Sequence, residues 1–284
     1  MKKLSQQVLR NERRLKPHFQ IEIFQQQQKL DDQCIEKLSS ELILSKSQKI
    51  LSIDLIKKWH LDLSNLTDRS VKDLSLSLSQ LSRLDQLNLG LYGWGYWNEN
   101  ITDSSLNYLT QAILFQDKLS EFKLDLNMWA YENQRITDKG VDRLLHGISL
   151  LNNLGSLELN MKGWGDGNYE ITDNTIIGLS ECLKKLKNLS EIKLILWKNI
   201  GLQATKQLNR TLSNLKNLTK IEIQFESCSS QQQAAQYENV DQRLFQIKVN
   251  AIQKRKLLFQ VEGILVNLEQ LIPKCTLWDI ILKL

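Results

Sequence analysis

Histidine, cysteine and proline are scarce in this chain of 284 residues, and long apolar runs are absent. The four cysteines lie far apart, form no CxxC pair and have no histidine cluster nearby, so we expect reduced thiols and no metal site. The three histidines fall on different expected elements, and the repeat register places no serine or cysteine nucleophile beside His146. Only two prolines occur and no long flexible linker is seen, which favours one domain. No run of 18 apolar residues exists, so we expect no membrane span.

Motifs of catalysis and nucleotide binding are also missing. The chain has no Walker loop, GxGxxG, HExxH, GxSxG or zinc pattern, and its Gly-Trp-Gly sequences are typical of turns. We therefore expect no enzymatic activity, no cofactor and no small-molecule substrate. The net charge of +5 would permit weak attraction to nucleic acid or to acidic proteins but specifies neither. We do not expect nucleic acid as the partner, because no outward row of residues forms a basic stripe.

The chain does have a repeat of 35 positions between Leu84 and Leu196. Large apolar residues recur at three phases of it: Leu84, Leu119, Leu154 and Leu189; Leu87, Phe122, Leu157 and Ile192; Leu89, Leu124, Leu159 and Leu194. Ile-Thr-Asp triplets keep the same spacing, beginning at Ile101, Ile136 and Ile171. A fixed period between about 20 and 50 residues is the signature of a solenoid. Each unit reads as a strand, a tryptophan-bearing loop and a helix.

These units resemble the leucine-rich-repeat family, and their lengths are most similar to its ribonuclease-inhibitor-like class, here with tryptophan-bearing loop insertions. The resemblance implies an α/β solenoid with a curved parallel sheet on the concave side and helices on the convex side. Glutamine-rich composition combined with such repeats is similar to that of ciliate proteins.

The expected organisation is one leucine-rich-repeat domain over residues 1–284. Residues 1–50 form an N-terminal cap with a degenerate repeat, including a short strand at His18–Ile23 and a helix after Asp31 and Asp32. Residues 51–226 form the regular repeats. Residues 227–284 carry apolar residues at helical spacing and are expected to form a helical C-terminal cap. The basic segment Met1–Phe19 is interpreted as a solvated lead-in, with an organellar transit peptide as the alternative.

Strands are expected near Leu61, Leu89, Leu124, Leu159, Leu194 and Ile223. The interval from Leu61 to Leu89 predicts a first regular unit of 28 residues, without the seven-residue loop insertion of later units. Because strand side chains alternate between faces, Leu87 and its equivalents point inward. One outward row then reads His60, Asn88, Lys123, Glu158, Lys193 and Glu222. Lysine and glutamate alternate along this row and can satisfy each other.

Three further rows have expected structural roles. Asp68, Asp103, Asp138 and Asp173 precede helical patterns and are interpreted as helix caps. Trp94, Trp129 and Trp164 are expected to stack as a ladder that forms the miniature core of the inserted loops. The alternative is that these three tryptophans are an aromatic surface offered to a partner. Asn98, Asn133 and Asn168 are expected to form a second ladder that bonds the backbone of adjacent loops.

The candidate partner-binding residues follow from the outward register of the strands: Ile195, Trp197, Tyr92, Lys162 and Asn127. Ile195 and Trp197 stand out as large apolar side chains expected to face away from the core. The alternative for Trp197 is that it replaces the ladder tryptophan in a unit that lacks the insertion.

The functional hypothesis is a non-catalytic protein–protein interaction scaffold or adaptor within a larger assembly, whose protein partner the sequence does not identify. One alternative, implied by the resemblance, is a regulator of an enzyme, either nuclease-inhibitor-like or GTPase-activating-like. Another is an RNA- or ribosome-associated factor. The expected location is cytoplasmic, with an organellar or ciliary assembly as the alternative.

Overall fold

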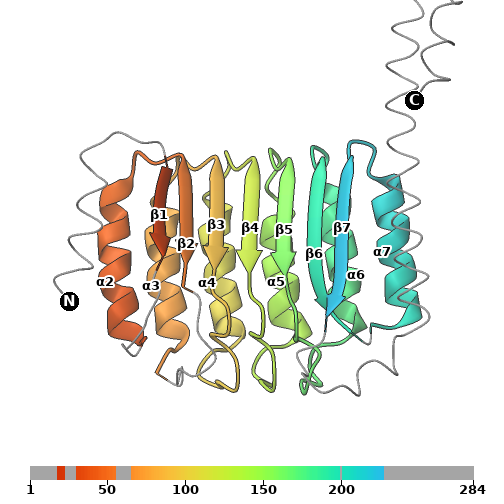
Figure 1. The fold of residues 1–284 in the computed structure, drawn as a ribbon, viewed down its shortest axis with the longest axis horizontal. Helices are drawn as coiled ribbons and strands as arrows, with labels where there is room; N and C mark the ends of the chain where they lie inside the picture. Colours follow the sequence, from red (N-terminus) through yellow and green to blue (C-terminus); the bar gives the residue numbers. More distant parts are fainter. Residues whose placement is uncertain (1–17, 23–29, 56–64, 199, 227–284) are drawn as a thin grey trace, which may run out of the picture.

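The computed structural model describes residues 18–22, 30–55, 65–198 and 200–226. Within them, strands and helices alternate along the chain, as an α/β solenoid requires (Figure 1). The strands are β1 (His18–Glu22), β2 (Ile50–Asp54), β3 (Gln86–Gly90), β4 (Glu121–Asp125), β5 (Ser156–Asn160), β6 (Glu191–Trp197) and β7 (Lys220–Glu226). The helices are α2 (Asp32–Leu42), α3 (Asp68–Ser79), α4 (Asp103–Leu114), α5 (Asp138–Ile148), α6 (Asp173–Lys185) and α7 (Leu202–Asn214), with a short 3₁₀ turn, η1 (Ile43–Ser45).

The strands form one seven-stranded parallel sheet in sequence order, from β1 to β7. The helices cover one face of the sheet, and the loops that follow the strands gather along its carboxyl edge (Figure 1). Neighbouring units pair in the 35-residue register, as in Leu89 with Leu124 and Leu124 with Leu159. The predicted fold, a leucine-rich-repeat solenoid, is confirmed for the described residues. The helical cap expected in residues 227–284 lies outside them.

The core is built from stacked inward columns. Leu87, Phe122, Leu157 and Ile192 form one such column, and every member is at most 3% exposed. Leucine, isoleucine and valine side chains of the helices close the other wall, for example Leu106 and Val141. Burying one such side chain stabilises the fold by roughly 1.5–3 kcal/mol. A single unit cannot enclose its own apolar face, so stability comes from the stack.

The outward face of the sheet carries the predicted alternation of charges. Lys123 Nζ lies 3.3 Å from the Glu158 carboxylate, and Lys193 Nζ lies 3.6 Å from Glu158 and 3.4 Å from Glu222. Partial burial lowers the pKa of Lys193, but Glu158 and Glu222 outweigh it and raise the pKa overall. The expected mutual pairing is confirmed, so these charges are already compensated within the sheet.

The strand expected near Leu61 was placed wrongly. The strand before β3 is β2, in which Ile53 pairs with Leu89 at a separation of 36 positions, so the predicted 28-residue unit is wrong. The row position assigned to His60 belongs to Ser52, whose Oγ accepts a hydrogen bond from Asn88 Nδ2 at 3.0 Å. Both Leu51-Ser52-Ile53 and Leu61-Asp62-Leu63 alternate in the same way, so local pattern could not choose between them. Residues 56–64 lie outside the described part of the chain.

Candidate functional site

The loops after β3, β4 and β5 are held together by buried tryptophans. Trp94, Trp129 and Trp164 are each 0% exposed. The rings of Trp94 and Trp129 stack with centroids 6.4 Å apart and planes inclined by 11°. Trp129 Nε1 donates to the Leu91 carbonyl at 2.5 Å, and Trp164 Nε1 donates to the Leu126 carbonyl at 2.7 Å. The indoles of Trp129 and Trp164 therefore link their loops to the preceding ones, whereas Trp94 Nε1 is buried without a partner in the described part of the chain. All three side chains are buried and unavailable to a binding partner.

The asparagine row supplies a second set of links. Asn133 Nδ2 donates to the carbonyls of Asn98 and Ile101 in the preceding loop, both at 2.9 Å, and Asn168 Nδ2 donates to that of Asn133 at 2.6 Å. The Oδ1 atoms accept backbone amides of their own loops, as from Arg135 to Asn133 at 3.0 Å. Asn98, Asn133 and Asn168 are at most 3% exposed, and each satisfies both ends of its amide, as a buried amide must.

The aspartates of the Ile-Thr-Asp triplets do not cap their own helices, which corrects the interpretation of Asp68, Asp103, Asp138 and Asp173. The preceding threonine is the cap: the side chain of Thr137, for example, accepts the Lys139 amide of α5. The aspartate is the first helical residue, and its carboxylate reaches the next unit. Asp68 accepts the Thr102 amide at 2.8 Å, the Thr102 hydroxyl at 2.7 Å and the Ser105 hydroxyl at 2.5 Å.

The same hydrogen bonding from an aspartate carboxylate to the next unit, here called the aspartate staple, recurs along the solenoid. Asp103 bonds Thr137, Asp138 bonds Thr172 and Thr175, and Asp173 accepts the Gly201 amide at 2.8 Å. Sequence periodicity placed the aspartates at the helix starts but could not distinguish a cap within a unit from a bond between units. The four aspartates are therefore structural, because their carboxylates accept hydrogen bonds from the neighbouring repeats.

Replacing Asp138 by alanine is expected to lower the free energy of unfolding by about 2 kcal/mol. The substitution removes the acceptor for the Thr172 amide and for the Thr175 hydroxyl, which is 2% exposed, and an unsatisfied buried donor costs roughly 1–3 kcal/mol. Urea denaturation of the full chain measures the change. Asp142→Ala is the matched control, because Asp142 lies on the same helix and is exposed. Equal stability of the two variants would show that the staple contributes nothing.

Gly140 allows the aspartate staple to be tested by adding a hydrogen bond, which should raise stability. It stands where the other units have Ser105 and Thr175, and a Cβ added to it would lie 2.1 Å from Asp103 Oδ1. Gly140→Ser is expected to raise the free energy of unfolding by about 0.5 kcal/mol or more, since it removes a helical glycine and restores the third staple bond. Gly140→Ala adds the Cβ without the hydroxyl. Greater stability of alanine than of serine would mean that Asp103 cannot move to receive the bond.

Exposed aromatic side chains gather on the same loops, outside the buried ladder. Trp97 is 68% exposed and Tyr169 is 87% exposed, and Tyr96 and Tyr131 lie between buried and exposed. The ring of Tyr96 lies 5.2 Å from that of Tyr131 and 6.2 Å from that of Trp97. We call Tyr96, Trp97, Tyr131 and Tyr169 the aromatic rim. Because the core and the ladder do not need these side chains, the aromatic rim is the candidate binding surface.

The backbone under the aromatic rim is strained. The second left-handed position of the three loops is occupied by Trp97 (φ 50), Glu132 (φ 51) and Gly167 (φ 70). Glycine adopts this region freely, whereas a bulky residue there is an outlier that costs on the order of 1–3 kcal/mol. Gly167 shows that glycine fits this turn, so the geometry does not require tryptophan or glutamate.

The partner-binding residues predicted from the strands have different environments. Tyr92, Asn127 and Lys162 begin the three inserted loops and are half-buried, and Ile195 on β6 is also half-buried. Tyr92 donates its hydroxyl to Met128 Sδ at 3.3 Å. These four remain candidates next to the aromatic rim.

Trp197 is not an exposed residue, and the expectation that it faces away from the core is wrong. It is 4% exposed and belongs to the hydrophobic core. A Cβ added to Gly165 would lie 2.3 Å from its Cδ1 atom, so the indole packs on the backbone of the last tryptophan loop. The unit that contains β6 has no inserted loop to cover that backbone, and the indole covers it instead.

The sequence interpretation missed Trp97 and Tyr169 as exposed side chains. The signal was present in the 35-residue register, because Trp97 aligns with Glu132 and Gly167, and Tyr169 aligns with Glu99 and Gln134. A column whose other members are charged, polar or glycine belongs to the surface.

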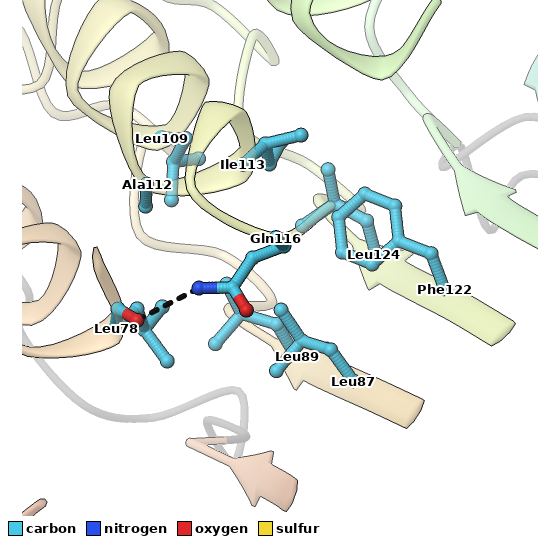
Figure 2. A pocket seen from close by; sticks show the side chains of 9 residues that line it. All are labelled: Leu78, Leu87, Leu89, Leu109, Ala112, Ile113, Gln116, Phe122 and Leu124. Carbon is cyan, nitrogen blue, oxygen red and sulfur yellow. Dashed lines mark hydrogen bonds between the residues drawn. The ribbon is translucent and has the colours of Figure 1, made fainter. Parts of the chain in front are cut away.

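An internal cavity lies between α4 and strands β3 and β4, under Gln116 (Figure 2). Its volume is about 10 Å³, and apolar side chains such as Leu109 and Phe122 line it. Gln116 Nε2 donates to the Leu78 carbonyl at 2.8 Å, whereas its Oε1 is buried without a partner in the described part of the chain. The space is of the size of one water molecule, so it is no binding site for an organic ligand.

Ionisable groups in the described ranges show burial effects without a reactive cluster. Burial raises the pKa of the Cys182 thiol to about 12, which suits an inert core residue. Burial also raises the pKa of Asp125, against the lowering effect of the hydrogen bond from the Asn127 amide. No group of three or more His, Cys, Asp or Glu residues in these ranges could hold a metal ion. None of the helices described is long and apolar enough to cross a membrane.

Fold and loops together define a leucine-rich-repeat solenoid with tryptophan-laddered loops. No family model and no curated protein matches the chain. Among solved structures, it is similar to leiomodin-1 actin-binding site 2, with a TM-score of 0.44 and 17% identity over 70% of this chain and 97% of that chain. It is also similar to the C-terminal domain of tropomodulin from Caenorhabditis elegans, with a TM-score of 0.43 and 14% identity over 71% of this chain and 98% of that chain.

Proposed function

We propose that this protein is a non-catalytic scaffold or adaptor that binds another protein along the carboxyl edge of its sheet. The observation that carries the proposal is the aromatic rim, in which Trp97 and Tyr169 are 68% and 87% exposed. Large aromatic side chains are the type most enriched at protein–protein hot spots, and contiguous exposed apolar surface is uncommon without a use. Tyr92, Asn127, Lys162 and Ile195 extend the proposed surface onto the strand ends. The whole chain is proposed to act as one domain, with residues 1–50 and 227–284 closing its ends.

Site-specific photo-crosslinking tests the proposal. A photo-reactive phenylalanine analogue replaces Tyr169 in the full chain, expressed in the cells that make the protein. The matched control places the same analogue at Phe115, which is 60% exposed at the end of α4, on the opposite edge of the sheet. We expect a discrete protein adduct from position 169 that is absent from position 115.

The proposal also predicts that the adduct depends on the rim chemistry. Adding Trp97→Ser to the Tyr169 probe should reduce the adduct at least fivefold, while adding Leu44→Ser, a change at a distant exposed leucine, should not. Identical adducts at positions 169 and 115, or none at 169, would contradict a docking role for this edge.

A further inference from the structure

Trp97 combines an exposed side chain with a strained backbone conformation. At φ 50 it holds the left-handed conformation that Gly167 supplies without strain two units later. Packing does not explain this choice, because the side chain is 68% exposed. Strain that persists without a packing reason is the kind of outlier from which a functional role can be inferred. Glu132, at φ 51, is also exposed and left-handed, with its carboxylate lying over Gly167 of the next loop.

The loop segments that carry the aromatic rim are acidic. Residues 96–100, 131–135 and 166–170, the loop segments that carry the aromatic rim, contain one basic residue, Arg135, while the chain as a whole has a net charge of +5. Their acidic residues, here called the rim acids, are Glu99, Glu132, Asp166 and Glu170. Glu99, Glu132 and Glu170 are exposed and Asp166 is partly so. The local net charge is therefore opposite in sign to that of the protein.

Aromatic faces and carboxylates select the same kind of ligand group. The face of an indole or phenol ring attracts cations, and an arginine guanidinium also stacks on it. Carboxylates bind guanidinium and ammonium groups through charge-assisted hydrogen bonds. The rim acids would repel phosphate and carboxylate groups, which disfavours nucleic acid and acidic peptides as ligands.

We infer that the aromatic rim and the rim acids bind a lysine- and arginine-rich segment of a partner protein. The inference rests on the proposed function and specifies the chemistry of its partner. Tyr96 and Tyr131, on adjacent loops, have ring centroids 5.2 Å apart, so three loops span about 10 Å. An extended chain advances about 3.3 Å per residue, so three to four residues cross the rim. Basic residues at alternate positions of such a segment face the same side, so about two of them contact the rim at once.

Fluorescence anisotropy with a labelled (Arg-Ser)6 peptide tests the inference on the full chain. We expect saturable binding that weakens as salt is raised, and at least tenfold tighter binding than to a labelled (Glu-Ser)6 peptide. Trp97→Gly should weaken binding at least tenfold without lowering the midpoint of urea unfolding, because glycine relieves the left-handed strain. Phe115→Ser on the opposite edge is the matched control and should leave binding unchanged.

Glu132 provides the second pair of variants. Glu132→Gly removes charge and strain together, whereas Glu132→Gln removes the charge alone. Both should weaken binding of (Arg-Ser)6 at least threefold, and only Glu132→Gly should raise the unfolding midpoint. If the Trp97→Gly protein does not fold, the two Glu132 variants alone test whether the rim binds the basic peptide.

Four results would overturn the inference: no binding of (Arg-Ser)6, unchanged binding to the Trp97 and Glu132 variants, tighter binding of (Glu-Ser)6, or tighter binding of oligouridine RNA. Tighter binding of the peptide after deletion of residues 1–16 would overturn it as well, since the chain's own basic segment would then occupy the surface. A crosslink at position 169 that (Arg-Ser)6 does not displace would sink the inference and leave the scaffold proposal standing. The absence of any crosslink there would remove the scaffold proposal.

Discussion

Replacing Trp129 by alanine is expected to lower the free energy of unfolding by about 3–5 kcal/mol, the cost of removing a fully buried tryptophan. The side chain is 0% exposed, stacks on Trp94 and donates to the Leu91 carbonyl. Its loss would open a cavity between two inserted loops and leave that carbonyl with only the longer bond from the Trp94 amide, at 3.4 Å. Chemical denaturation of the full chain gives the change directly.

Trp129→Phe is the matched control, because it keeps an aromatic ring and removes the Nε1 donor. We expect it to cost about 1–2 kcal/mol, for the lost hydrogen bond and a smaller ring. Trp97→Ala, in an exposed part of the same loop system, should change stability by less than about 0.5 kcal/mol. A loss below 1 kcal/mol for Trp129→Ala would mean that the loops do not derive their order from the ladder.

Replacing Trp197 by alanine is expected to lower the free energy of unfolding by about 3 kcal/mol. The indole is 4% exposed and packs over Gly165, at the junction between the last tryptophan loop and β6. The reverse change, Gly165→Ala, should also destabilise the protein, since its Cβ would lie 2.3 Å from Trp197 Cδ1. Double-mutant analysis measures the coupling of the two positions.

Binding data separate the two roles considered for Trp197. If the side chain belongs to the core, Trp197→Ala weakens partner binding only in proportion to unfolding, and binding recovers where the variant is fully folded. Glu191→Ala, at an exposed residue on the amino end of the same strand and outside the proposed surface, serves as the control. A tenfold loss of binding at an unchanged melting temperature would restore Trp197 as a contact residue.

The regular part of the fold was predictable because each repeated position carries its own physical requirement. Leu89, Leu124 and Leu159 recur because a parallel stack needs one apolar side chain per strand at the same height. Lys123 and Glu158 alternate because like charges on adjacent strands repel. The second unit could not be predicted in the same way, since two neighbouring stretches alternate equally well and only pairing with β3 selects Ile50–Asp54.

The candidate site was predictable only in part. The inserted loops were evident within each unit, but only an alignment of the three loops indicates which of their aromatic residues face water. Trp94 and Trp97 stand three positions apart in one loop, and one is fully buried while the other is 68% exposed. The left-handed turns at Gly93 and Trp97 decide which way each side chain points.

The sequence by itself determined the repeat period, the parallel strand–loop–helix order and the columns of the core, because these follow from the spacing of apolar residues within each unit. Tertiary structure decided whatever depends on contacts between units. The structure shows that Asp68 and Asp138 bond the next repeat and do not cap their own helices, and that Trp197 is buried. It also left Trp97 and Tyr169 in water, since exposure depends on what the neighbouring loop covers and one unit's sequence does not contain that information.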